Sequence, residues 1–172
     1  MRRLLAVMLL SLPFAAVAQG ARVVQFNLID ERGLAQPIGR IAFEDTRYGL
    51  LISPSLNSLP PGVHGFHMHE NPSCAPGREK GEVKPGLAAG GHYDPDRTRR
   101  HRGPYRDDGH KGDLPVLYVD EKGNAEIQVL APRLKLRDFR GRSVMIHAGG
   151  DNYLDEPHAL GGGGGRIACA VW

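Results

Sequence analysis

RVVQFNLI, residues 22–29, is the stretch that decides the fold class. Alternate residues form one polar-leaning face and one apolar face, and the apolar face consists of Val24, Phe26 and Leu28. A period of two is typical of a β-strand that buries one side only. The chain therefore begins its folded part with a half-buried strand.

Other short β-like runs follow, separated by residues that favour turns. They lie at residues 39–43, 49–53, 62–70, 117–119, 125–129, 143–147 and 167–172. Helical periodicity is scarce, and the 172 residues include 23 Gly and 13 Pro. This pattern predicts an all-β fold, an antiparallel sandwich or barrel, in a single domain without internal repeats.

Two long segments, residues 71–115 and 148–166, interrupt the pattern. Both are rich in glycine, and we expect no strand in the first. Loops of this length inside a compact domain are usually functional or disordered. Gly161 to Gly165 could form a flexible surface loop or pack closely against the rim of an active site, and composition does not decide between the two.

The N-terminus resembles a secretory signal peptide. Arg2 and Arg3 precede an apolar run from Leu4 to Val17, which closes on Ala16-Val17-Ala18. A basic start, a short apolar stretch and an A-x-A site predict cleavage after Ala18, leaving residues 19–172 as the mature domain. The run is too short for a typical transmembrane helix, so we expect export to the periplasm, with full secretion as the alternative.

The charge of the chain is modest. The formal net charge is +3, and it falls to about +1 without the two arginines of the signal peptide. Several arginines crowd one segment, at positions 97, 99, 100, 102 and 106, but Asp107 and Asp108 follow them. A solvated loop face is favoured over a nucleic-acid site, and no membrane contact is expected after cleavage.

Cys74 and Cys169 are the two cysteines of the chain. An even count in an exported protein suggests a disulfide, and two free thiols are the alternative.

Histidine spacing indicates a metal site. His67 and His69 are two residues apart on a predicted strand, so both rings project from the same face and can reach one ion. His64 lies three residues before His67 and should point the other way, which favours a structural hydrogen-bonding role. His147 ends another β-like run and could return to the face of His67 and His69.

A second set of potential ligands lies in the first long segment: His92, His101, His110 and Asp113. Three imidazoles and one carboxylate can fill a tetrahedral zinc site completely, and such a closed site is structural. Metal binding would also explain how a long loop with few apolar residues stays ordered.

Four motifs together resemble the copper/zinc superoxide dismutase family, of the exported bacterial type. They are HGFHMHE (64–70), GGHYDP (90–95), GHKGDLP (109–115) and GGGGGRIAC (161–169). The resemblance runs from about Val23 to Trp172 and implies an antiparallel Greek-key β-barrel or sandwich with two long functional loops.

The resemblance also implies a role for each matching residue. It assigns copper, one ion per chain, to His67, His69, His92 and His147, and zinc, one ion per chain, to His92, His101, His110 and Asp113. His92 is shared, and its ring bridges the two ions. Cys74 and Cys169 match the family disulfide. The ligand chemistry agrees, because Cu(II) prefers tetragonal nitrogen sites and zinc suits a closed cage.

The implied reaction is dismutation of superoxide to dioxygen and hydrogen peroxide, which protects against superoxide outside the cytoplasm. Zinc has no redox chemistry, so electron transfer belongs to copper, and His92 would donate a proton to the product. Arg166 matches the arginine that attracts the substrate anion, with a carboxylate-paired surface arginine as the alternative. Asp151 matches the carboxylate linking copper and zinc ligands, with an ordinary loop aspartate as the alternative.

Other functions fit less well. A copper- or zinc-buffering protein of the same fold would bind both metals without turnover. A zinc hydrolase needs an open position on the ion, whereas this ligand set is full. Gly165 and the basic loop depart from the family pattern, and His158 matches nothing in it. A homodimer is a possible assembly.

Overall fold

The computed structural model describes residues 20–172, so the predicted signal peptide lies outside the described residues. Strands β and short 3-10 helices η follow one another as β1 (Arg22–Asp30), β2 (Gly33–Thr46), β3 (Gly49–Leu56), β4 (Gly62–His64), β5 (Phe66–His69), β6 (Gly77–Glu79), β7 (Glu82–Lys84), η1 (Leu87–Ala89), β8 (Leu117–Val119), β9 (Val129–Ala131), η2 (Leu136–Phe139), β10 (Ser143–His147), η3 (Ala159–Gly162) and β11 (Arg166–Val171). No helix in this part of the chain is long and apolar enough to cross a membrane.

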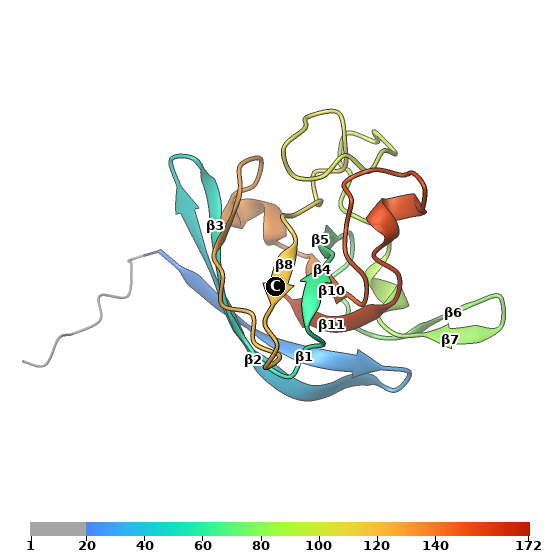
Figure 1. Cartoon of the computed structure of the whole chain (residues 1–172). Helices are drawn as coiled ribbons and strands as arrows, with labels where there is room; N and C mark the ends of the chain where they lie inside the picture. Colours follow the sequence, from blue (N-terminus) through green and yellow to red (C-terminus); the bar gives the residue numbers. More distant parts are fainter. Residues whose placement is uncertain (1–19) are drawn as a thin grey trace, which may run out of the picture.

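One large antiparallel sheet dominates the molecule. Its strand order is β5-β10-β11-β1-β2-β3-β9, and it curls around the core (Figure 1). The strands β4 and β8 form a separate pair, as do β6 and β7. Sequence neighbours β1, β2 and β3 lie side by side, whereas β11 returns to pair with β1. The prediction of an all-β antiparallel fold is confirmed.

The hydrophobic core fills the space inside the curled sheet. Phe26 of β1, Ile41 of β2 and Phe66 of β5 are fully buried there. Leu117 and Val119 of β8 join the same core from the β4–β8 pair, which therefore closes its open side. The apolar face predicted for residues 22–29 is thus directed inward at Phe26, as a half-buried strand requires.

The β5–β10–β11 end of the sheet has a core face and a metal-ligand face. Met68 and Val144 are paired across β5 and β10 and pack in the core. On the other face, His67 is paired with Met145, which is in turn paired with Cys169 of β11. Strand alternation therefore places histidines and the cysteine on the side away from the main core.

Three of the sequence predictions were wrong in detail. Residues 62–70 form two strands in different sheets, because the chain breaks at Gly65 between β4 and β5. Residues 71–115 contain the β6–β7 hairpin, where no strand was expected. The run 125–129 becomes strand only at Val129, and Ala125 makes a single bridge to Leu56.

The long loop after β7 continues the sheet beyond its edge strand β5. The Met68 amide donates to the Gly112 carbonyl at 2.9 Å, and the Tyr93 amide donates to the Met68 carbonyl at 2.8 Å. This pairing sets His69 opposite His92 and His67 opposite Asp113. A side chain at Gly112 could not be accommodated, since a Cβ there would lie 2.3 Å from the Met68 carbonyl oxygen.

Candidate metal centre

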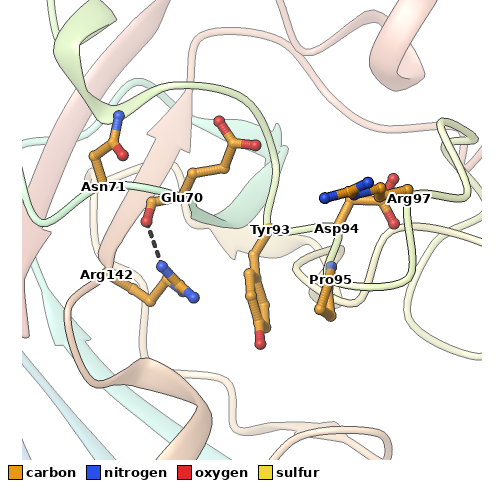
Figure 2. A pocket seen from close by; sticks show the side chains of 7 residues that line it. All are labelled: Glu70, Asn71, Tyr93, Asp94, Pro95, Arg97 and Arg142. Carbon is orange, nitrogen blue, oxygen red and sulfur yellow. Dashed lines mark hydrogen bonds between the residues drawn. The ribbon is translucent and has the colours of Figure 1, made fainter.

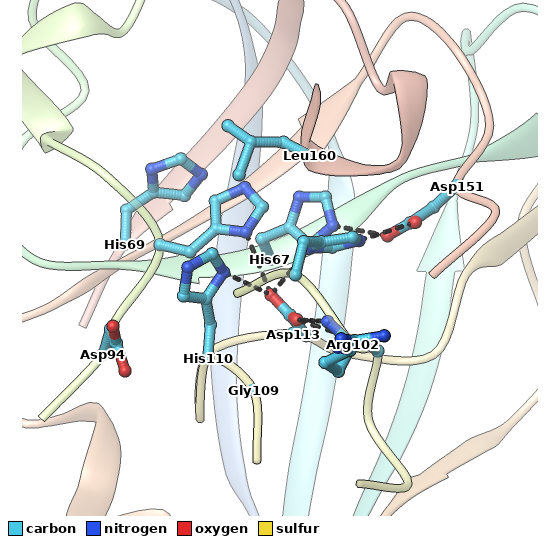
Figure 3. Close-up of polar contacts among 12 residues, drawn as sticks. His67, His69, Asp94, Arg102, Gly109, His110, Asp113, Asp151 and Leu160 are labelled. Carbon is cyan, nitrogen blue, oxygen red and sulfur yellow. Dashed lines mark hydrogen bonds and ion pairs between the residues drawn. The ribbon is translucent and has the colours of Figure 1, made fainter. Parts of the chain in front are cut away.

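Four histidines from three parts of the chain meet at the edge of the sheet. His67 and His69 come from β5, His147 ends β10, and His92 is brought in by the loop that pairs with β5. One nitrogen from each ring lies within 4.8 Å of the others, and all four residues are buried. The predicted set of His67, His69, His92 and His147 therefore forms one cluster, part of which is seen in Figure 3.

Each ring of this first cluster has one nitrogen held by the fold. His67 Nε2 contacts Asp151 Oδ2 at 2.8 Å, while Nδ1 of His69 and of His147 contact the carbonyls of Gly90 and Gly164 at 3.0 and 3.2 Å. These contacts fix the orientation of the rings, as partners of metal-binding histidines commonly do.

The other nitrogen of each ring is buried and has no hydrogen-bond partner. These atoms are His67 Nδ1, His69 Nε2, His92 Nε2 and His147 Nε2. Buried polar atoms without partners are rare and unfavourable. Four of them converging on one point fit a metal ion as the missing partner.

A second cluster surrounds the carboxylate of Asp113. Its Oδ1 lies 3.0, 3.1 and 3.4 Å from the Nδ1 atoms of His92, His101 and His110. Ligand atoms bonded to one tetrahedral zinc ion lie about 3.3 Å from each other. The spacing of His92, His101, His110 and Asp113 thus fits a closed four-ligand site. Figure 3 shows two of these side chains, His110 and Asp113, facing each other.

The backbone holds the second oxygen of Asp113. The amides of Arg102 and Gly103 both donate to Asp113 Oδ2 at 3.1 Å, so only Oδ1 faces the three rings. His92 presents Nδ1 to this cluster and Nε2 to the first one. It is the ring common to both clusters, as the sequence predicted.

Asp151 joins the two clusters from outside. Its carboxylate contacts His67 Nε2 at 2.8 Å and His101 Nε2 at 2.7 Å, and its side chain is fully buried. An ionised carboxylate only accepts hydrogen bonds, so both histidines carry their hydrogen on Nε2 and turn Nδ1 inward. The alternative of an ordinary loop aspartate does not describe this contact pattern.

The rings of the first cluster are neutral. Burial lowers the pKa of His67 and of His69 well below the ordinary value for histidine, and the nearby His92 lowers both further. Burial also lowers the pKa of His92, and it lowers the pKa of His147 to about 4. Neutral imidazole is the form that binds metal, so at pH 7 the inward nitrogens of His67, His69 and His147 need lose no proton, whereas His92 must lose its remaining proton to present both nitrogens to metal.

Positive charge is favoured in the second cluster. Burial opposes a charge on His101, but its hydrogen bonds to Asp113 and Asp151 outweigh this and raise the pKa of the ring to about 9. Although burial alone would raise the pKa of Asp113, the side chains of His101, His110 and His92 hold it far below the usual aspartate range. The carboxylate is therefore ionised, and the cluster suits a cation.

Arg166 begins β11 opposite His147, the residue that ends β10. Its guanidinium is half-buried and donates to the carbonyls of Gly86 and Gly90. Within the described residues no carboxylate lies at ion-pair distance from it, so the alternative of a carboxylate-paired arginine does not apply. Its positive charge contributes to lowering the pKa of His69 and of His147, and it thus acts at the first cluster.

Other predicted positions are also located. Cys74 and Cys169 form a disulfide, as predicted. His64 lies outside both clusters, with its ring nitrogens 2.7 and 2.8 Å from the carbonyls of His147 and Pro60. Its separation from His67 arises because β4 and β5 belong to different sheets, and strand parity alone does not explain it. His158 is exposed.

A polar cleft of about 490 Å³ lies beside the loop that carries His92. Figure 2 shows its lining, Glu70, Asn71, Tyr93, Asp94, Pro95, Arg97 and Arg142. Arg142 donates to the Glu70 carbonyl at 2.6 Å and stacks on Tyr93, with 4.3 Å between guanidinium carbon and ring centre. None of these side chains belongs to either cluster, so the cleft is not the metal centre.

Sequence reasoning did not find the backbone groups that orient the rings. The carbonyls of Gly90 and Gly164 and the amides of Arg102 and Gly103 carry no side-chain signature. Only the density of glycine near the histidines indicated a close approach of backbone.

Two metal clusters that share one histidine, on an all-β frame, define a dinuclear metalloprotein. The family description copper/zinc superoxide dismutase (SODC) matches residues 38–172. A Cu-Zn superoxide dismutase of Photobacterium leiognathi is 54% identical over 136 residues, which are 79% of this chain and 79% of the relative. Cu-Zn superoxide dismutase 1 of Salmonella typhimurium (strain 4/74) is 52% identical over 158 residues, 91% of this chain and 89% of the relative.

A solved structure agrees with these matches. Cu/Zn superoxide dismutase from Brucella abortus has a TM-score of 0.85 and 47% identity, covering 88% of this chain and 98% of that chain. The chain belongs to the copper/zinc superoxide dismutase family. It uses copper and zinc to convert superoxide into dioxygen and hydrogen peroxide, and the alternative of a metal buffer without turnover is not favoured.

Proposed function

We propose that the first cluster is the copper site and the second is the zinc site, with one ion of each per chain. Copper is held by His67, His69, His92 and His147, and zinc by His92, His101, His110 and Asp113. The observation that carries this assignment is the convergence of buried, unpartnered ring nitrogens. Four nitrogens without a carboxylate suit Cu(II), whereas three imidazoles and a carboxylate suit zinc.

His92 is the residue that moves the proton in this proposal. Copper would supply the one-electron redox chemistry of both half-reactions, because zinc has no redox chemistry. His92 Nε2 faces the copper cluster while Nδ1 stays fixed on the Asp113 side. Nε2 could hold one proton on the copper side and donate it to the peroxide product, whose second proton would come from water. Proton and electron then travel together, which avoids uncompensated charge in a buried site.

Arg166 binds and orients the substrate anion. Its guanidinium is anchored through the two carbonyls but carries no paired carboxylate among the described residues, so its charge is available to superoxide. Positive potential at a cleft raises the association rate of an anion. Asp151 keeps the rings of His67 and His101 in the orientation that binds metal.

Metal analysis of three variants tests the two ligand sets. We expect His147→Ala to lose copper and keep zinc, and Asp113→Asn to lose zinc and keep most of its copper. His158→Ala serves as the control because His158 is exposed and belongs to neither cluster. Mass spectrometry gives the metal content, and superoxide consumption gives turnover. Loss of both metals from His147→Ala with zinc in excess would contradict the separate assignment.

We also propose that residues 1–18 direct export to the periplasm and that residues 19–172 form the mature domain. The A-x-A site and the Cys74–Cys169 disulfide support this, since disulfides persist in oxidising compartments. Fractionation of cells followed by N-terminal sequencing tests it, with Gln19 as the expected first residue. A cytoplasmic chain that retains Met1 would contradict it.

A homodimer stays a prediction. Val63 and Tyr118, paired across β4 and β8, are 47% and 49% exposed and supply an apolar surface that a second copy could cover. Sedimentation velocity over a range of concentrations distinguishes monomer from dimer.

A further inference from the structure

Arg133 joins the β9–η2 connection to the loop that carries the zinc-site residues. Its guanidinium is half-buried and donates to four backbone carbonyls of that loop. Nε contacts Pro104 at 3.0 Å and Nη1 contacts Gly109 at 3.3 Å, while Nη2 contacts Gly103 at 3.0 Å and His110 at 2.6 Å. A single side chain thus holds both ends of the segment 103–110.

In these bonds a charged group donates only to neutral acceptors. No carboxylate of residues 20–172 pairs with Arg133. The four residues whose carbonyls it binds are buried, where a carbonyl without a donor is unfavourable. The planar fork of a guanidinium offers five N–H donors in a fixed geometry, which a lysine ammonium cannot reproduce.

Two of the four residues whose carbonyls Arg133 binds also contact the zinc set. The Gly103 amide donates to Asp113 Oδ2, and its carbonyl is held by Arg133. The His110 carbonyl accepts from Arg133 and also from the Asp113 amide at 3.3 Å, while the His110 ring faces Asp113 Oδ1. Arg133 therefore fixes the backbone of His110 and of Gly103, the residue whose amide holds Asp113.

We propose that Arg133 is a positioning residue for zinc, which sets the affinity of the second cluster without touching its ligand atoms. The proposal depends on the zinc set given above. Without the guanidinium, His110 and Gly103 lose their common anchor, whereas the copper ligands His67, His69 and His147 come from strands to which Arg133 donates no hydrogen bond. Zinc binding should weaken selectively.

Arg133→Lys tests this, with Arg137→Ala as the control. Arg137 is an exposed arginine of η2 that makes no hydrogen bond or ion pair in the structure. Zinc affinity is measured by competition with a chelator, and cobalt(II) absorption reports the geometry of the same site. We expect Arg133→Lys to lower zinc affinity by about 10–100-fold and to shift the cobalt bands. Copper affinity should change by less than about threefold, and Arg137→Ala should match the wild type.

The outcomes separate positioning from general stabilisation. A residue that only stabilises the fold would lower the stability of the zinc-free and zinc-loaded forms equally and leave zinc affinity unchanged, which would overturn the proposal. If the variant folds only with zinc, it is compared with the wild type by the zinc concentration at which half of the protein is folded. Failure to fold at any zinc concentration would also overturn it. If Asp113→Asn binds zinc as tightly as the wild type, the zinc assignment itself is wrong, and that result differs from an unaffected Arg133 variant.

Discussion

A histidine ring has two nitrogens, and the rings of the first cluster divide their use between fold and metal. One nitrogen of His67, His69 and His147 is fixed by a carboxylate or a carbonyl, which leaves the other turned inward without a partner. Ring orientation is therefore decided before any ion binds, and the residues behind the ligands govern affinity.

Asp151→Asn should weaken metal binding at the cluster whose histidine loses its partner. The amide has one acceptor oxygen, while its NH2 group faces a ring N–H, so either His67 or His101 loses its hydrogen bond. We expect metal affinity to fall by about 10–100-fold, measured by chelator competition for copper and zinc separately. The control is Asp96→Asn. Asp96 is exposed, and its side chain makes no hydrogen bond or ion pair among the described residues, so both affinities should stay unchanged. Equal affinities in the two variants would show that Asp151 does not orient the rings.

Arg166→Glu should slow capture of the substrate. Reversal of the charge beside His69 and His147 replaces attraction of superoxide by repulsion, so kcat/KM should fall at least about tenfold. Both metals should stay bound, because Arg166 donates only to backbone carbonyls. Pulse radiolysis at several salt concentrations gives kcat/KM and shows how far salt screens the attraction of the anion. Arg40→Glu on β2 is the control for a remote change of charge, and unchanged activity in Arg166→Glu would remove the steering role.

At the scale of elements, the glycine run 161–165 is packed at one end and free at the other. Gly161 is buried with φ of +71°, and a Cβ there would lie 1.8 Å from Asp151 Oδ1. Gly163 packs against the ring of His147, whereas a Cβ at Gly165 would meet nothing within 4 Å. The sequence left a flexible loop and a closely packed rim as alternatives, and η3 is the packed rim.

Gly161→Ala should therefore destabilise the protein by about 2–4 kcal/mol, from backbone strain together with displacement of Asp151. Gly165→Ala should change the free energy of unfolding by less than about 0.5 kcal/mol. Chemical denaturation of the two variants, each loaded with metal, measures the difference between their free energies of unfolding. Similar stabilities would mean that η3 can shift away from Asp151 without cost.

The strands were easier to predict than the connections between them. Alternation in residues 22–29 and the short apolar run at 143–147 predicted the correct elements, because β1 is partly exposed while β10 is buried along its whole length. The break at Gly65 and the β6–β7 hairpin were missed, since a change of sheet or a short exposed hairpin leaves no hydrophobic period. Strand parity grouped His67 with His69, and ligand chemistry grouped His92 with His101, His110 and Asp113. The place of His92 in the first cluster followed only from the family resemblance. The contacts of Arg133 could not, because carbonyl acceptors have no sequence signature.

At the scale of the whole molecule, the disulfide attaches the segment after β5 to the large sheet. Cys74 and Cys169 are separated by 95 residues, and both are buried beside Met145 and Ala89. The segment 75–90 that follows Cys74 supplies the Gly86 and Gly90 carbonyls to Arg166. The crosslink thus stabilises the fold and also holds the segment that anchors Arg166 beside the first cluster.

Replacement of both cysteines by serine should lower the free energy of unfolding by about 2–5 kcal/mol, because a long loop in the unfolded chain is no longer closed. This loss of stability should appear as a lower melting temperature in calorimetry of the metal-loaded protein. Reductant should lower the wild-type melting temperature to a similar level and leave the double variant unchanged. A wild-type protein whose melting temperature resists full reduction would contradict this.

The pairing of the long loop after β7 with β5 has a consequence for solubility. β5 is the last strand of the large sheet, and its outer edge is covered only because residues 91–93 and 112–114 occupy its amides and carbonyls. An uncovered edge strand is a template on which another chain can add. The loop that carries His92 and Asp113 thus also protects the protein against self-association. Loss of metal that loosens this loop should expose Phe66 to His69 as an unpaired strand edge and promote self-association.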